Sequence, residues 1–143
     1  MANVKINSIP SHNYQVVEQI TEAKQLERSD SGKYFVWDQG DYDITLPKMA
    51  TNLAGWNIIL TRRTLSDDEF DITTHADDGA LIHYIENEGD DSSSGTAITT
   101  IRVRKSSVNS HTAKLPCFVK FWTDGTYWYS HLYGVQAGVF SQS

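Results

Sequence analysis

The sequence predicts an all-β fold, an antiparallel β-sandwich of jelly-roll type with at most one short helix. Short runs of strand-favouring residues, about nine of them, recur at the ~8–12-residue spacing typical of sandwiches and barrels. Turn-forming segments rich in Asp and Gly separate these runs. Only one short segment combines a helix N-cap residue with good helix formers. Spacing leaves the strand order open.

The chain divides into an extended N-terminal arm, residues 1–13, and a single domain, residues 14–143. The arm has few charges and neither a helical nor a strand period, so either a partner holds it or it packs on its own domain. Residues 14–20 are a first strand. In residues 21–28, Thr21 is a candidate N-cap followed by helix formers, which predicts one or two turns of helix.

The clearest strand signal of the first half lies in residues 31–47. Tyr34–Trp37 is a run of aromatic and β-branched residues, Gln39–Asp41 has turn chemistry, and apolar and polar residues alternate over 42–46. This pattern predicts a strand, a turn and a second strand, that is, a hairpin. Pro47 should end the second strand because proline has no amide hydrogen for a ladder.

The middle of the chain continues with short strands. Residues 56–61, 70–74 and 81–85 are predicted strands, while residues 86–95 are a polar surface loop. In residues 96–104, the odd-numbered positions from Ala97 to Val103 face one way and the even-numbered positions from Ile98 to Arg104 the other, so one face is core and the other is outside.

The C-terminal part carries the strongest turn signal of the second half. Residues 115–122 and 126–133 are strands joined by a hairpin at Asp124-Gly125, a pair that tolerates positive φ. Residues 134–143 form either a closing strand or a tail.

Composition narrows the classes of partner. The formal net charge of −6 argues against nucleic acid as the main partner, because phosphate binding depends on clustered Lys and Arg. No apolar run approaches the ~20 residues that span a membrane, and the N-terminus lacks a secretion-signal pattern. We therefore expect a soluble, cytoplasmically made protein without a membrane partner. The single cysteine, Cys117, lies in an apolar run and should have a packing role.

Motifs for catalysis or cofactor binding are absent from the sequence. Neither glycine-rich phosphate motif nor HExxH occurs, so we expect no enzyme activity, no cofactor and no metal. Two acidic groups could be interpreted as metal sites, but we favour them as turn-forming residues that bond backbone amides: Asp38, Asp41 and Asp43, and Asp71, His75, Asp77 and Asp78.

A row of aromatic residues is the most informative feature. Tyr127, Tyr129, His131 and Tyr133 share one face of the last predicted strand. An exposed row would be a docking or sugar-stacking surface, because such rings supply a large contact area at small entropic cost. Alternatively, one face packs on the core and the other forms cross-strand aromatic pairs. Burial against another subunit would satisfy both interpretations.

Several short motifs, taken together in order and spacing over residues 15–133, resemble bacteriophage virion proteins, especially small capsid decoration (cement) proteins and related fibre or knob modules. They are Leu26, Ser31-Gly32-Lys33, Ile44-Thr45-Leu46-Pro47, Gly55-Trp56 and Asp124-Gly125-Thr126-Tyr127-Trp128. The resemblance implies a β-rich homotrimer on the capsid surface, bound to the major capsid protein and without catalysis.

This resemblance leads to a hypothesis with two rivals. In the hypothesis, the arm contacts the capsid, with Val4, Ile6, Ile9 and Pro10 as its candidate contacts. Tyr127, Tyr129 and Tyr133 are the candidate subunit contacts. One rival is a fibre or knob module that binds a host receptor or glycan, and the other is an enzyme acting on polysaccharide, which needs two close carboxylates.

Overall fold

The structure is a computed structural model that describes residues 16–37, 40–62, 68–87, 92–93, 95–104, 117–134 and 140–143. Within these ranges the chain is mostly β-structure, with two 3₁₀ turns, η1 (Arg28–Asp30) and η2 (Thr51–Leu53), and no α-helix. The strands are β1 (Val17–Ile20), β2 (Lys24–Gln25), β3 (Tyr34–Trp37), β4 (Ile44–Thr45), β5 (Asn57–Arg62), β6 (Phe70–Thr73), β7 (Ile82–Asn87), β8 (Ser92–Ser93), β9 (Thr100–Val103), β10 (Cys117–Thr123), β11 (Trp128–Tyr133) and β12 (Phe140–Gln142).

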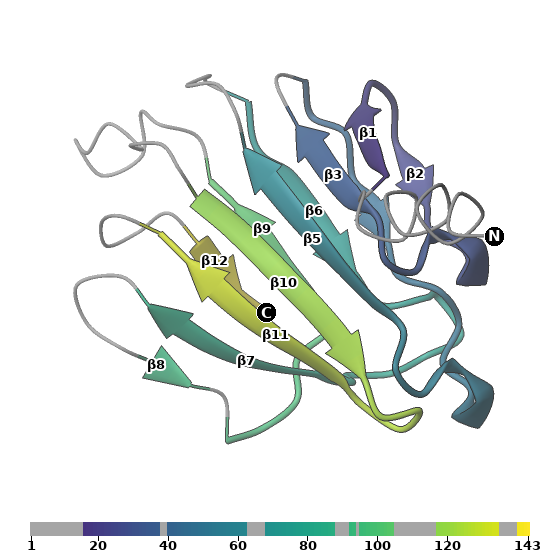
Figure 1. The fold of residues 1–143 in the computed structure, drawn as a ribbon. Helices are drawn as coiled ribbons and strands as arrows, with labels where there is room; N and C mark the ends of the chain where they lie inside the picture. The colour runs from purple at the N-terminus through teal and green to yellow at the C-terminus, as the bar shows by residue number, and fades with distance from the viewer. Residues whose placement is uncertain are drawn as a thin grey trace, which may run out of the picture.

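The described strands form two sheets that share one hydrophobic core. One sheet has seven strands in the order β1-β3-β5-β10-β11-β7-β8, and the other has five in the order β12-β9-β6-β4-β2. In Figure 1 the five-stranded sheet lies behind the seven-stranded one. Trp37 of β3 packs on Phe70 of β6 with ring centroids 4.5 Å apart, and both rings are buried, so the two layers meet directly.

Both sheets are mixed, so the predicted entirely antiparallel jelly-roll is not confirmed. The pairs β1–β3, β3–β5, β2–β4, β4–β6 and β7–β11 are parallel. For the first four pairs, the physical reason is that consecutive strands from β1 to β7 alternate between the two sheets. A chain that crosses to the opposite layer and returns runs in its original direction, and it therefore lies parallel to the strand it left.

The predicted hairpin between residues 34–37 and 42–46 is wrong, although both strands exist. β3 belongs to the seven-stranded sheet and β4 to the five-stranded sheet, so they do not pair. Gly40, with φ +97°, lies in the connection, and its carbonyl accepts the indole N–H of Trp37 at 2.9 Å. Ile44 and Trp37 are both fully buried. The alternating pattern identified the two strands. Their partners were decided by packing between the two sheets, which buries residues of both strands in the shared core.

The predicted helix over residues 21–28 is also wrong. This segment contains β2, and the Leu26 N–H donates to the carbonyl of Thr45 at 2.8 Å. Leu26 is its one buried residue, so the segment lacks the repeated apolar face that would hold a short helix on the core. A ladder with β4 satisfies its backbone instead.

Other predicted elements are confirmed. Ile101 and Val103 of β9 are buried while Arg102 between them is exposed. The β10–β11 hairpin is antiparallel, and Gly125 in its turn has φ +91°. β12 closes the five-stranded sheet, so the C-terminal end contains a strand. The two-residue β8 lies within residues 86–95, the predicted polar loop.

Candidate binding face

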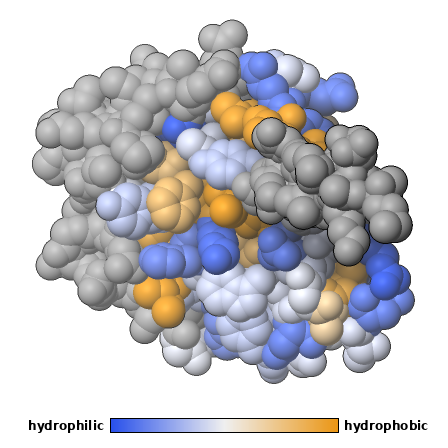
Figure 2. Space-filling model, in the orientation of Figure 1, coloured by the Kyte–Doolittle hydropathy of each residue, from blue (hydrophilic) through white to orange (hydrophobic). Residues whose placement is uncertain are grey.

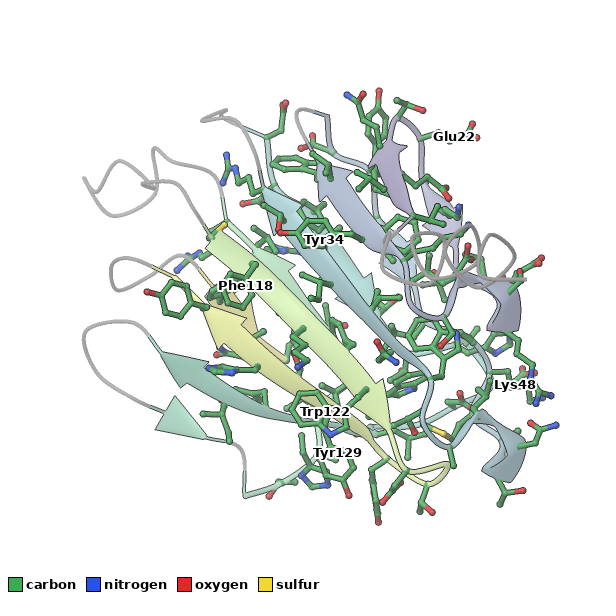
Figure 3. All side chains as sticks on the ribbon, viewed as in Figure 1. Glu22, Tyr34, Lys48, Phe118, Trp122 and Tyr129 are labelled. Carbon is green, nitrogen blue, oxygen red and sulfur yellow. The ribbon has the colours of Figure 1, made fainter. Side chains whose placement is uncertain are left out.

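The outward side of the seven-stranded sheet carries a group of aromatic side chains that we call the aromatic face. Along β10 and β11 every second residue points outward, because side chains alternate across a strand. Figure 3 shows two of these rings, Trp122 and Tyr129, side by side near the β10–β11 turn, with Phe118 nearer the other end of β10. The aromatic face consists of His83, Phe118, Trp122, Tyr127, Tyr129 and Tyr133.

The largest part of this face is a row of stacked rings across three strands. The register places Trp122 of β10 beside Tyr129 of β11, and Tyr129 beside His83 of β7. The ring centroids of Trp122 and Tyr129 are 5.9 Å apart at 22°, and those of Tyr129 and His83 are 6.1 Å apart at 24°. Tyr127 and His83 form a T-shaped pair, with ring centroids 4.9 Å apart and an interplanar angle of 69°. These cross-strand pairs lie on the outside of the sheet, so the tyrosine row is not part of the core.

A second, smaller pair lies at the other end of the same strands. Phe118 and Tyr133 stack with ring centroids 4.9 Å apart and an interplanar angle of 15°. Tyr133 is 39% exposed. Lys120 and His131 occupy the register between this pair and the Trp122 row. The aromatic face therefore consists of two ring clusters separated by Lys120 and His131.

Aliphatic side chains extend the exposed apolar surface toward both edges of the sheet. Val17 on β1 is 64% exposed and Ile85 on β7 is 53% exposed. Figure 2, in the orientation of Figure 1, shows apolar patches interrupting the hydrophilic surface on this side. Exposed large apolar side chains that gather on one face mark an interaction surface more often than isolated ones do.

Asp124 fixes the turn that carries the Trp122 row. Its Oδ1 accepts the backbone N–H groups of Thr126 at 2.8 Å and Tyr127 at 2.9 Å, and its Oδ2 accepts the Tyr129 hydroxyl at 2.9 Å. These bonds, the backbone ones first, hold the pKa of Asp124 below its usual value. The hydrogen bond to Asp124 raises the pKa of Tyr129. The ring of Tyr129 is thus oriented from two directions, by stacking and by its hydroxyl.

A shallow depression opens beside Trp122 on the side away from Tyr129. It has a volume of about 420 Å³ and is lined by Gly55, Asn57, Lys120, Trp122 and Thr123. The register explains it, because the neighbour of Trp122 on β5 is Asn57, whose side chain is much smaller than an indole. Trp122 is 37% exposed.

The glycines of the Ser31-Gly32-Lys33, Gly55-Trp56 and Asp124-Gly125 motifs have structural roles. Gly32 and Gly55 have φ +82° and +87°, and their N–H groups donate to the carbonyls of Asn57 at 2.7 Å and Thr123 at 2.8 Å. A Cβ on Gly125 would lie 2.8 Å from the carbonyl oxygen of Thr51. These positions need glycine for backbone conformation or close approach, which explains their role in building the fold.

The lysine of the Ser31-Gly32-Lys33 motif belongs to a partly buried ion network. Lys33 Nζ contacts Asp30 Oδ1 at 2.6 Å and Glu18 Oε2 at 2.8 Å, and Lys24 also pairs with Glu18. Burial alone would raise the pKa of Asp30, but the bonds from Lys33 and the Glu27 N–H lower it below its usual value. The pKa of Glu18 is lowered by Lys24 and then Lys33, and the pKa of Lys33 is raised by Asp30 and then Glu18.

Asp38 lies outside the described residues, and the other members of the two acidic groups form hydrogen bonds. Asp41 and Asp43 accept the backbone N–H groups of Glu69 and Asp71, each at 2.9 Å, so they bond amides as expected, although amides of the neighbouring segment. The carboxylate of Asp71 is bidentate with Arg102 at 2.6 and 2.8 Å. In the described ranges no group of three or more His, Cys, Asp or Glu side chains is placed to hold a metal ion.

Two further findings concern the predicted residues. Tyr127, Tyr129 and Tyr133 all lie on the aromatic face, whereas Val4, Ile6, Ile9 and Pro10 lie outside the described residues. Among the described residues, no helix is both long and apolar enough to cross a membrane.

The sequence prediction missed the outward residues of β10. Phe118, Lys120 and Trp122 alternate with the buried Cys117, Val119 and Phe121. Lys120 could have shown which alternate residues of this strand face outward, since lysine is almost never fully buried.

Comparisons of the chain with protein-family models, curated proteins and solved structures find no significant match.

Proposed function

We propose that the chain is a capsid decoration (cement) protein of a bacteriophage, a homotrimer without catalytic activity that binds the major capsid protein on the virion surface. The observation that carries this proposal is the exposed apolar surface on one side of the seven-stranded sheet, with Ile85, Tyr133 and Trp122 exposed by 53%, 39% and 37%. Burying such an apolar surface against another protein stabilises the complex. On a repeating capsid lattice, many weak contacts of this kind add up to a high overall affinity.

The subunit contact is proposed at Tyr127, Tyr129 and Tyr133, and the Phe118–Tyr133 pair forms one end of it. The two rings present parallel aromatic area at one end of β10 and β11, and Tyr133 remains partly exposed after stacking. Aromatic residues of this kind are enriched at subunit interfaces because they bury a large area with few rotatable bonds.

Light scattering on the purified protein tests the trimer. The expected mass is three times the 16.1 kDa of the chain. A Phe118→Ala/Tyr133→Ala variant should shift the mass toward the monomer, whereas Arg102→Ala, exposed on the other sheet, should leave it unchanged. A monomer at all concentrations for the unmodified protein contradicts the trimer.

The capsid contact is proposed for the arm, residues 1–13, through Val4, Ile6, Ile9 and Pro10, with strand addition to a capsid subunit as an available mode. The test mixes the protein, with and without residues 1–13, with particles that lack it. The copies bound per particle and the melting temperature of the capsid are then measured. Lattice-stoichiometric binding that raises the melting temperature and is weakened by the deletion supports the proposal, and no binding contradicts it.

A fibre or knob module for a host glycan is the second candidate, and the depression beside Trp122 favours it. The shared core of the two sheets also supports classing the fold as a β-sandwich. Both candidates use such a sandwich as a rigid support for a surface that binds.

A further inference from the structure

We propose that the depression beside Trp122 binds a pyranose ring that carries a carboxylate, as in a uronic acid. The proposal rests on the second candidate function, a module that binds a glycan, and does not depend on capsid binding. A sugar titration therefore tests it independently of the particle assay. It rests on the open face of one indole ring, two polar side chains beside it and the shape of the floor.

The indole of Trp122 is covered on one side only. Tyr129 stacks on that side at 5.9 Å and is itself held by Asp124 and His83. The other side faces the depression, across which the β5 residue is Asn57. The ring is therefore fixed in orientation before a ligand arrives, and such preorganisation reduces the entropic cost of binding.

The polar groups suit a sugar acid. Asn57 donates from Nδ2 to the carbonyl of Gly55 at 3.0 Å, and no described residue donates to its Oδ1, which can therefore accept a hydroxyl. Lys120 is exposed and forms no ion pair with any described residue. Its ammonium group can pair with a carboxylate by a charge-assisted hydrogen bond.

The floor and the size of the depression agree with one or two sugar rings. Gly55 has no side chain to fill the space, and its N–H bonds to Thr123, so the backbone there is fixed. The volume of about 420 Å³ falls within the ~300–1,000 Å³ of ligand sites. The C–H groups of a pyranose carry partial positive charge and complement the negative face of an indole. A nucleotide would also stack, but the net charge of −6 disfavours a ligand with several phosphates.

Nuclear magnetic resonance of the tryptophan indole N–H groups tests the site in the full chain. The protein has four tryptophans, and Trp37, Trp56 and Trp128 are at most 3% exposed, so they serve as internal references. The probes are methyl glucuronide and methyl galacturonide, with the neutral methyl glucoside and methyl galactoside as matched controls. We expect at least one acidic probe to shift the Trp122 signal with a Kd on the order of millimolar, and its neutral counterpart to bind about threefold to fivefold more weakly.

Three variants separate the contributions. Trp122→Ala should abolish binding, monitored on the Lys120 and Asn57 backbone signals, and Lys120→Gln should reduce the acidic probe to the affinity of its neutral counterpart. Arg102→Ala, exposed on the five-stranded sheet and outside the aromatic face, should bind as the unmodified protein does. The Lys120→Gln variant keeps the test decisive should Trp122→Ala misfold, because Lys120 is exposed. No shift at Trp122 with any of the four probes overturns the proposal, as does equal affinity for acidic and neutral probes.

Discussion

Replacing Asp30 by asparagine tests how the Ser31-Gly32-Lys33 segment is stabilised. Asp30 is 4% exposed, and its carboxylate accepts the Glu27 N–H at 2.8 Å and the Lys33 ammonium at 2.6 Å. An asparagine has one acceptor oxygen, so one of these two donors would face an amide NH₂ group. Hydrogen bonds that involve a charged group contribute ~1.5–3 kcal/mol, and we expect Asp30→Asn to lower the free energy of unfolding by about that amount.

The matched control is Glu18→Gln, which alters the same network at its exposed side. The Glu18 side chain is 32% exposed, and pairs at such positions contribute ~0–1 kcal/mol. Urea denaturation and thermal melts, both followed by tryptophan fluorescence, measure both variants. The melting temperature of Asp30→Asn should fall by roughly 5–10 °C. Equal losses for the two variants, or a loss below ~0.5 kcal/mol for Asp30→Asn, would refute the burial argument.

The same network predicts the direction of the pH dependence. The pKa values of Asp30 and Glu18 are lower in the folded protein than their ordinary values of 3.8 and 4.5. Their contribution to stability is therefore present above those ordinary values and is lost as the pH falls through the folded pKa values. Asp30→Asn should make the free energy of unfolding less dependent on pH below about 4. If the free energy of unfolding of Asp30→Asn falls with pH as steeply in this range as that of the unmodified protein, the role given to Asp30 is contradicted.

Three further predictions concern the turn, the core and the cysteine. Gly125→Ala should destabilise strongly in thermal melts, because φ is +91° and the Cβ would lie 2.8 Å from the carbonyl oxygen of Thr51, whereas Gly79→Ala has open space and should be tolerated. Phe121→Ala should cost ~3–5 kcal/mol in denaturant titrations, since the ring is fully buried, and a loss below ~1 kcal/mol contradicts this. Burial raises the pKa of Cys117 to about 11, so a disulfide reagent should modify it at pH 8 only after denaturant is added; rapid reaction in the native state contradicts this.

The sequence predicted strands well because local alternation and burial agree in them. The 34–37 run, the 70–74 alternation and the Asp124-Gly125 hairpin appear in the structure as β3, β6 and the β10–β11 turn. Strand partners were not predictable in the same way. A turn between two strands has similar residues whether the strands pair or cross to opposite sheets, and only the buried contacts of both faces distinguish the two cases.

The candidate site was predictable in part. The alternation of residues predicted the tyrosine row, but not the rings that stack on it. Trp122 comes from β10, the hairpin partner of β11. His83 comes from β7, more than 40 positions earlier in the sequence than Tyr129. Parallel pairing with β7 brings His83 to the row, and no short-range pattern encodes that pairing. The depression depends on the β5–β10 register, which places a short Asn57 beside a large indole.

The place of β10 in the seven-stranded sheet has a consequence for synthesis of the chain. β10 lies between β5 and β11, and 54 residues separate Arg62 at the end of β5 from Cys117 at the start of β10. A ribosome adds ~5–20 residues per second, so β10 is synthesised about 3–11 s after β5. Until then the edge of β5 that pairs with β10 in the folded protein has no partner strand. During that interval the nascent chain presents an unpaired strand, which other chains can capture. Slower translation or a higher expression rate should therefore increase aggregation before any folded subunit exists.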